Sequence, residues 1–167
     1  MAEPEWHRAN RDSWDQLVDL HLGPHGYDLT DLRAGSAQLG PIEAGELSAI
    51  EGKRIVHLQC HFGADSLRLA QRRAQVVGLD FSGRSIEVTR SLADEFGLAG
   101  RAHFVEADLY DAVRAIPAPP WVRHCVCHLG CHLLAAGYRA MGANRRVSAA
   151  LRRIALFSRR APRGLCI

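Results

Sequence analysis

The sequence predicts an α/β fold built on a parallel sheet. Three apolar runs between residues 54 and 108 alternate with two amphipathic stretches of helical length. Each run leads to a turn or an acid: Gly63 lies in the turn after the first, Asp80 ends the second, and Asp108 follows the third. Strands alternating with helices predict parallel pairing with right-handed crossovers. Ligands of such sheets bind beyond the carboxyl ends of the strands.

Periodicity and breakers place each element. A helix is predicted at 5–22 because Trp14, Val18 and His21 recur at helical spacing. Residues 27–45 are predicted to be irregular because glycine and proline interrupt them. The remaining elements are expected as a short helix at 43–50, a strand at 54–59, a helix at 64–73, a strand at 75–80, a helix at 83–96 that Gly97 ends, and a strand at 102–107.

Composition limits the class of protein. The chain has 167 residues and 47% hydrophobic content, enough for one globular domain with a core. No apolar run approaches the roughly 18 residues that cross a bilayer. The N-terminus is polar and acidic, unlike a secretory signal. Five cysteines are an odd number, which argues against a closed disulfide framework. We expect a cytoplasmic protein without membrane contact.

Charge divides the chain unevenly. All 18 acidic residues lie at or before Asp111, whereas residues 117–167 hold nine arginines and no acid. We therefore expect three parts. Residues 1–50 form an N-terminal helical cap on the substrate side, residues 51–116 hold the sheet, and residues 117–167 form an atypical Arg- and Cys-rich tail, irregular or helical.

The turn after the first strand carries a family resemblance. His57 to Gly63 read HLQCHFG, and a DFS strand end and a D-x-Y-D segment follow. With the preceding NRDSW, GYDLTDLRAG and PIEAGEL segments, this pattern resembles a bacterial subgroup of the class I S-adenosylmethionine-dependent methyltransferases over about residues 8–114. The family turn is D-x-G-C-G-x-G, so His57, Gln59 and His61 replace its acid and two of its glycines. The resemblance implies a Rossmann-like sheet, incomplete here with about three strands.

The resemblance also implies cofactor contacts. Asp80 would accept hydrogen bonds from the ribose hydroxyls, Phe81 would flank the adenine, and Asp108 would accept from the adenine amino group. The backbone of the first turn would approach the methionine part. The complete set implied for S-adenosylmethionine binding is His57, Gln59, Cys60, His61, Gly63, Asp80, Phe81, Ser82, Asp108 and Leu109.

The acceptor side is defined less sharply by the sequence. Trp14, His21 and Tyr27 would cover the cofactor and shape this side for a small-molecule methyl acceptor. The sulfonium already makes the methyl group electrophilic, so the protein mainly aligns the acceptor and excludes water. A base is needed only if the acceptor must lose a proton. His21, His25 and His61 are the candidates, and the sequence does not choose among them.

Each of these residues also has a structural interpretation. Asp80 could cap the following helix, as Ser82 would, and Trp14 could be a packing residue. His57 and His61 could be hydrogen-bonded core histidines.

Two other functions stay open for the chain. One is a dinucleotide-binding oxidoreductase, disfavoured because the turn lacks G-x-G-x-x-G. The other is a nucleic-acid-binding module that uses the arginine pairs of the tail.

The resemblance implies a fourth strand after Asp108, and residues 117–167 offer no such strand in register. The cysteines and histidines of the tail between 124 and 132 are too crowded for the usual spacing of zinc ligands, so no metal site is predicted.

Codons can be chosen for Trp121 to Ser148 that, shifted by one nucleotide, read GFDIVYVTWGAICWLPGIERWARIVAS. This string resembles the fourth strand and following helix of the family. We therefore expect that the tail is out of frame, that the chain is truncated in function, and that it transfers little methyl by itself.

Overall fold

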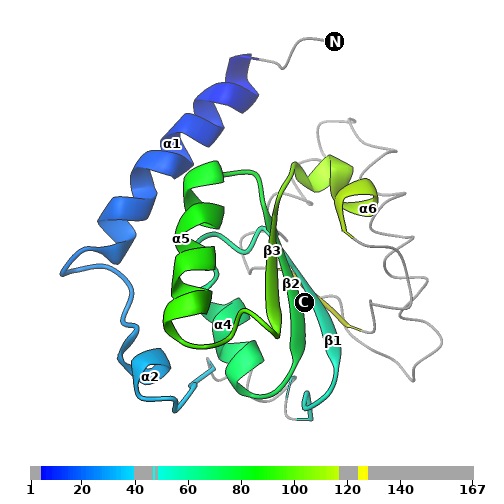
Figure 1. Ribbon diagram of the computed structural model, residues 1–167. Helices are drawn as coiled ribbons and strands as arrows, with labels where there is room; N and C mark the ends of the chain where they lie inside the picture. The colour runs from blue at the N-terminus through cyan, green and yellow to red at the C-terminus, as the bar shows by residue number, and fades with distance from the viewer. Residues whose placement is uncertain (1–4, 40–46, 48, 117–123, 128–167) are drawn as a thin grey trace.

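The computed structural model describes residues 5–39, 47, 49–116 and 124–127 (Figure 1). Helix α1 packs against α5, and helices cover both faces of a central sheet (Figure 1). The elements in chain order are α1 (Glu5–Leu22), α2 (Thr30–Arg33), β1 (Arg54–Leu58), α4 (Ala64–Gln71), β2 (Gln75–Asp80), α5 (Gly83–Glu95), β3 (Ala102–Glu106), the 3₁₀ helix η1 (Leu109–Asp111), α6 (Ala112–Ala115) and β4 (His124–Cys127).

The sheet is parallel throughout, with the strand order β3-β2-β1-β4. Its register aligns the strand ends: Leu58 of β1 lies opposite Leu79 of β2, and Asp80 lies opposite Glu106 of β3. The predicted three-stranded parallel core is therefore confirmed. Because all carboxyl ends meet at one edge, the turns that follow β1, β2 and β3 come together there.

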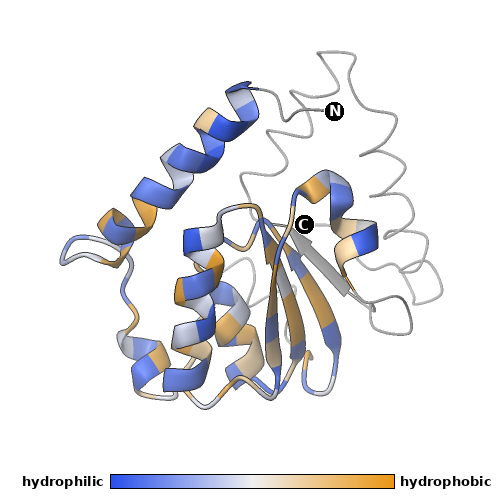
Figure 2. Cartoon of the chain, turned by 45° about the horizontal axis from the view of Figure 1, so that its top comes forward, coloured by the Kyte–Doolittle hydropathy of each residue, from blue (hydrophilic) through white to orange (hydrophobic). Residues whose placement is uncertain are grey.

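Burial on both faces explains why these runs form strands. Ile55, Val76 and Phe104 belong to the core beneath α4 and α5, while the alternating residues Val56 and Val77 belong to a second core that includes residues of α6. The orange, apolar positions along the strands are visible in Figure 2. Strands of a parallel sheet are normally covered on both faces, and side chains alternate between the faces with a period of two.

Local backbone conformations set the ends of the helices. Ser82 caps α5, because its Oγ accepts a hydrogen bond from the Ser85 N–H at 3.0 Å. Gly97, at φ 67°, follows the end of α5, as the sequence predicts. Helix α4 ends at Gln71, two residues earlier than expected, and Arg73 just beyond it has φ 68°.

The expectation that the tail offers no fourth strand is wrong. Strand β4 (His124–Cys127) pairs in parallel with β1, with Ile55 opposite His124 and Leu58 opposite Cys127. Without β4 the outer edge of β1 would present unpaired backbone N–H and C=O groups, and the short run His124–Cys127 satisfies them. The shifted reading frame also encodes its strand at these positions. Because a strand at these positions fits either reading frame, β4 does not test the out-of-frame hypothesis, which stays a prediction.

The N-terminal region differs from expectation at one place. Helix α1 matches its predicted range of 5–22. Residues 27–45 were expected to be irregular, yet α2 forms one turn there because Leu29 and Leu32 are buried in the core. The helix expected at 43–50 falls mostly outside the described residues. None of the described helices is long and apolar enough to cross a membrane.

Candidate functional site

Backbone hydrogen bonds tie the turns at the strand ends together. The Cys60 N–H donates to the Leu79 carbonyl at 3.0 Å, which joins the turn after β1 to β2. The Ala107 N–H donates to the Asp80 carbonyl at 2.9 Å, which joins the end of β3 to β2. The predicted groups of all three strand ends therefore occupy one edge of the sheet.

The Asp80 carboxylate lies at the centre of this edge. Its side chain is almost fully buried, and its two oxygens accept hydrogen bonds from the Ser82 N–H at 3.0 Å and the His61 N–H at 2.7 Å. Burial raises the pKa of Asp80, although these backbone hydrogen bonds counteract the rise. A carboxylate offers about four acceptor positions. Backbone N–H groups occupy part of this capacity, and the rest can serve donors such as ribose hydroxyls. The cap of α5 is Ser82, not Asp80.

The turn after β1 keeps a left-handed backbone at three positions. Gln59, His61 and Gly63 have φ values of 54°, 52° and 72°. These are the three glycine positions of the resembled D-x-G-C-G-x-G turn, so the backbone follows that turn while Gln59 and His61 add side chains. Gly63 cannot be replaced in the same way, because a Cβ there would lie 2.2 Å from Cγ2 of Thr89 in α5.

Two predicted cofactor residues direct their side chains into the core. The His57 imidazole is buried, and its Nδ1 lies 2.8 Å from the Ser66 hydroxyl of α4. The Cys60 thiol is buried in the core beneath α4 and α5, and burial raises its pKa well above its usual range. Only the backbone of Cys60 is therefore placed at the strand-end edge, and the core interpretation of His57 fits its contacts.

Asp108 and Phe81 lie beneath the start of α1. One Asp108 oxygen accepts a hydrogen bond from the Tyr110 N–H at 2.7 Å, and the other pairs with Nε2 of His7. The His7 ring also lies 5.8 Å from the Phe81 ring, centre to centre. The structure therefore brings His7 to the residues implied for adenine binding. Sequence reasoning missed His7, because its partners are about 75 and 100 residues away. Leu109 packs against the core that contains Ala112 and Ile116.

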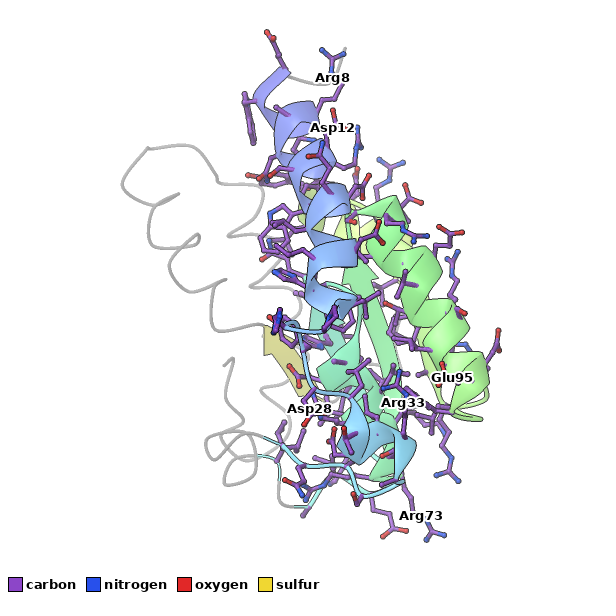
Figure 3. The ribbon with its side chains drawn as sticks, turned by 90° about the vertical axis from the view of Figure 1, so that its left-hand side faces the viewer. Arg8, Asp12, Asp28, Arg33, Arg73 and Glu95 are labelled. Atoms are coloured by element: carbon purple, nitrogen blue, oxygen red, sulfur yellow. The ribbon has the colours of Figure 1, made fainter. Side chains whose placement is uncertain are left out.

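Polar contacts hold α1 over this edge. The Ser82 hydroxyl donates a hydrogen bond to Oδ1 of Asp15, and the Arg84 N–H approaches the same oxygen at 3.3 Å. The Arg84 guanidinium also pairs with Asp19 at 3.1 Å. In contrast, Val18 is the buried residue of this 18-residue helix. Most other side chains of α1 extend outward, as Arg8 and Asp12 do in Figure 3.

The three residues predicted on the acceptor side converge on His61. Ring centres of Trp14, His21 and Tyr27 lie 5.4, 5.0 and 6.2 Å from the His61 ring. Nδ1 of His21 lies 3.3 Å from Nε2 of His61, within hydrogen-bonding distance. The Phe62 ring is next to His61 and Tyr27. We call these residues the His61 cluster: Trp14, His21, Tyr27, His61 and Phe62.

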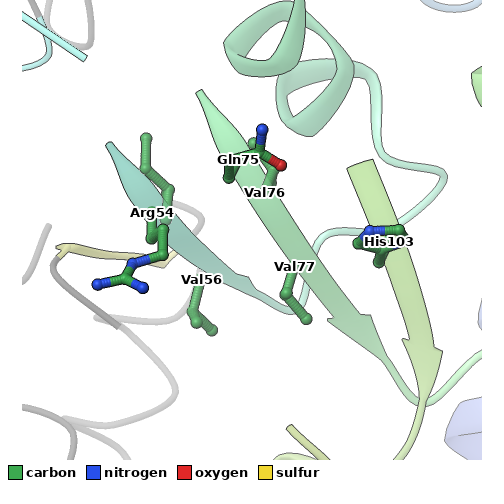
Figure 4. A pocket seen from close by; sticks show the side chains of 7 residues that line it. Arg54, Val56, Gln75, Val76, Val77 and His103 are labelled. Carbon is green, nitrogen blue, oxygen red and sulfur yellow. The ribbon is translucent and has the colours of Figure 1, made fainter. Parts of the chain in front are cut away.

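A shallow depression lies elsewhere on the sheet and contains none of these groups (Figure 4). Arg54, Gln75 and His103 line it at the amino ends of β1, β2 and β3, together with valines of the strands. Ligands of parallel sheets bind at the opposite, carboxyl ends. The strand-end edge around Asp80 is therefore the better candidate site.

Comparisons with known proteins agree with this topology. The chain is similar in structure to magnesium protoporphyrin IX methyltransferase from Synechocystis PCC 6803 with bound S-adenosylmethionine, with 20% identity, a TM-score of 0.55 and coverage of 76% of this chain and 63% of that one. It is also similar to a [4+2]-cyclase, with 18% identity, a TM-score of 0.52 and coverage of 70% and 47%. No protein-family model matches the chain.

A third similarity comes from sequence. Sixty residues are 40% identical to a 23S rRNA (uracil(1939)-C(5))-methyltransferase of Nitrosospira multiformis, which is 36% of this chain and 14% of that protein. The chain thus covers less than two thirds of each of these relatives. Together with the sheet order, the comparisons show that the chain has the class I S-adenosylmethionine-dependent methyltransferase fold. Because a cyclase has a similar structure, the fold alone does not determine the reaction.

Proposed function

We propose that the chain belongs to an S-adenosylmethionine-dependent methyltransferase that binds its cofactor at the carboxyl ends of β1, β2 and β3. The observation that carries this proposal is the Asp80 carboxylate. It is held by the Ser82 and His61 N–H groups and keeps acceptor capacity for ribose hydroxyls. The left-handed turn from Gln59 to Gly63 supports it, since such turns let backbone approach a ligand.

The neighbouring residues have defined roles in this proposal. Phe81 flanks the adenine, and Asp108 accepts from its amino group. His7 already contacts both residues. The adenine must therefore displace the His7 imidazole or share its position. The cofactor supplies an electrophilic methyl group. The protein aligns the acceptor with it, and α1 and the His61 cluster exclude water from above.

We propose a small molecule as the methyl acceptor. The half-exposed Trp14 and Tyr27 rings suit a planar ligand. Nucleic-acid binding relies on clustered Lys and Arg, and the His61 cluster contains neither residue type. An RNA acceptor is the rival, since the relative from Nitrosospira multiformis methylates rRNA. Methylation of total RNA by the chain would favour the rival. An acceptor found among small hydroxyl compounds would favour the proposal.

Cofactor binding is tested by calorimetry with S-adenosylhomocysteine. We expect saturable binding to the 167-residue chain and a loss on the order of 100-fold in Asp80→Asn, because hydrogen bonds to an ionised carboxylate contribute about 1.5–3 kcal/mol each. Asp94→Asn is the matched control, since Asp94 lies exposed on α5. Binding of NAD in place of S-adenosylhomocysteine would support the oxidoreductase instead. Equal affinities in Asp80→Asn and the wild type would overturn the proposed site.

A further inference from the structure

His61 occupies a backbone conformation that ordinarily favours glycine. A non-glycine residue in the left-handed region costs roughly 1–2 kcal/mol, and His61 adopts φ 52° at a glycine position of the resembled turn. Backbone strain of this kind concentrates at functional sites. The backbone N–H of His61 already serves Asp80, and glycine would supply that N–H as well. The imidazole itself is therefore the feature to explain.

The His61 imidazole is paired with a second imidazole from α1. The 3.3 Å distance between His21 Nδ1 and His61 Nε2 permits one hydrogen bond, in which one nitrogen donates and the other accepts. When His21 donates from Nδ1, its Nε2 is left as the basic nitrogen. Within the described part of the chain, no hydrogen bond involves His21 Nε2. His61 then fixes the orientation of His21 and stabilises the imidazolium that forms when Nε2 takes a proton.

Aromatic rings flank this imidazole pair and face solvent. Trp14 is 38% exposed and Tyr27 is 46% exposed, although both contact the pair edge-on or at a tilt. Half-exposed aromatic rings are suited to hold planar, apolar ligands with a polar group at one end. His25, in the same segment, is exposed and lies outside the cluster, so the structure separates it from the other two candidate bases.

The cluster also adjoins the proposed cofactor site. His61 joins the two, since its backbone donates to Asp80 at 2.7 Å while its ring contacts His21. A molecule held against Trp14 and Tyr27 would therefore lie beside the residues proposed to bind the cofactor. This adjacency is what a transfer between cofactor and acceptor requires.

We propose that His21, positioned by His61, is the general base of the transfer, and that Trp14 and Tyr27 bind an acceptor with a conjugated hydroxyl, a phenol or an enol. This inference rests on the proposed function. The acceptor O–H bond breaks and its proton moves to His21 Nε2. The acceptor oxygen then bonds to the methyl carbon while the carbon–sulfur bond of the sulfonium breaks, and that electron pair stays on sulfur. An imidazole is basic near neutral pH and suits a hydroxyl more acidic than an aliphatic alcohol.

The test uses 4-nitrophenol, whose phenol and phenolate forms absorb at different wavelengths. The 167-residue chain is titrated with the probe in the presence and absence of S-adenosylhomocysteine, and the change in the probe's absorbance measures binding in every variant. We expect bound probe to be enriched in phenolate in the wild type and in the control His25→Gln. His21→Gln should still bind the probe but lose the enrichment. Trp14→Ala should weaken binding about 3- to 10-fold, as expected for one aromatic contact.

His61→Gly tests the positioning role separately. Glycine suits φ 52° and keeps the N–H that donates to Asp80, so affinity for S-adenosylhomocysteine should be retained. The pH profile of phenolate formation should shift, because His21 loses its partner. Equal phenolate enrichment in His21→Gln and wild type, or failure of the wild type to bind the probe, would overturn the inference. Probe binding without S-adenosylhomocysteine binding would instead overturn the proposed function.

Discussion

The two sides of the candidate site are built differently. The floor, formed by the carboxyl ends of β1, β2 and β3, is held by backbone pairing, and four of the five β1 residues are buried. The cover is helix α1 (Glu5–Leu22). This helix has one buried residue, Val18, and is attached by Asp15, Asp19 and His7. A floor of this kind positions groups rigidly, whereas a cover held by polar contacts can be released at small cost.

The contacts of the cover fall on functional positions of the floor. Asp15 contacts the cap residue of α5, His7 contacts Asp108, and His21 contacts His61. The same contacts that attach α1 therefore lie over the residues proposed to bind cofactor and acceptor. Three experiments can break or sharpen this contrast.

The largest effect is expected in the floor. Gly63→Ala places a Cβ 2.2 Å from Thr89 Cγ2 at φ 72°, so it combines overpacking with backbone strain. We expect the free energy of unfolding to fall by on the order of 3 kcal/mol. Gly97→Ala is the control, because Gly97 has φ 67° with nothing within 4 Å of the added atom. It should cost about 1 kcal/mol. Urea unfolding measures both, and equal losses would show that strain alone explains Gly63.

A smaller, pH-dependent effect is expected where α2, which follows the cover in the chain, meets α4. Both Asp31 oxygens accept hydrogen bonds from Arg68, at 2.8 and 2.9 Å. This guanidinium lowers the pKa of Asp31 from 3.8 to about 2. Because the folded-state pKa is depressed, the stabilisation is present above pH 3.8 and is lost as the pH falls toward 2.

Asp31→Asn tests that linkage. The variant should be less stable than the wild type at neutral pH, and the difference should shrink between about pH 4 and pH 2. Urea unfolding across this range measures it. Asp12→Asn, at an exposed position of α1 (Figure 3), should leave the difference near zero at every pH. A gap between Asp31→Asn and wild type that is constant with pH would show that the carboxylate charge is not the source.

The smallest effect is expected where cover and cofactor compete. His7→Ala removes the imidazole that pairs with Asp108 and lies against Phe81. We expect affinity for S-adenosylhomocysteine to rise a few-fold, because the adenine no longer has to displace that ring. Calorimetry measures the change, with Arg8→Ala as the control on the outward side of α1 (Figure 3). Weaker binding in His7→Ala would mean that His7 supports the adenine instead.

The sequence by itself determined the floor. The apolar periods, the Gly63 turn and the acids at 80 and 108 predicted three parallel strands and the edge at which their ends meet. These signals are local, since a strand, its turn and the following cap lie within a few residues of each other. Local signals also predicted an end of α4 that is two residues too late, because no glycine or proline marks the left-handed backbone at Arg73.

Only the tertiary structure decided which side chains meet across the site. It placed His7 on Asp108 and gathered Trp14, His21 and Tyr27 around His61. It also paired β4 with β1, although the sequence of the tail led us to expect no strand in register there. Whether residues 117–167 are out of frame stays a prediction that an independent read of the coding DNA tests. The physical reason for the division is distance along the chain. The contacts of α1 and the following loop with His61 and Asp108 join residues about 35 to 100 positions apart, so they depend on how α1 lies across the sheet, and a pattern within one helix or strand carries no information about that placement.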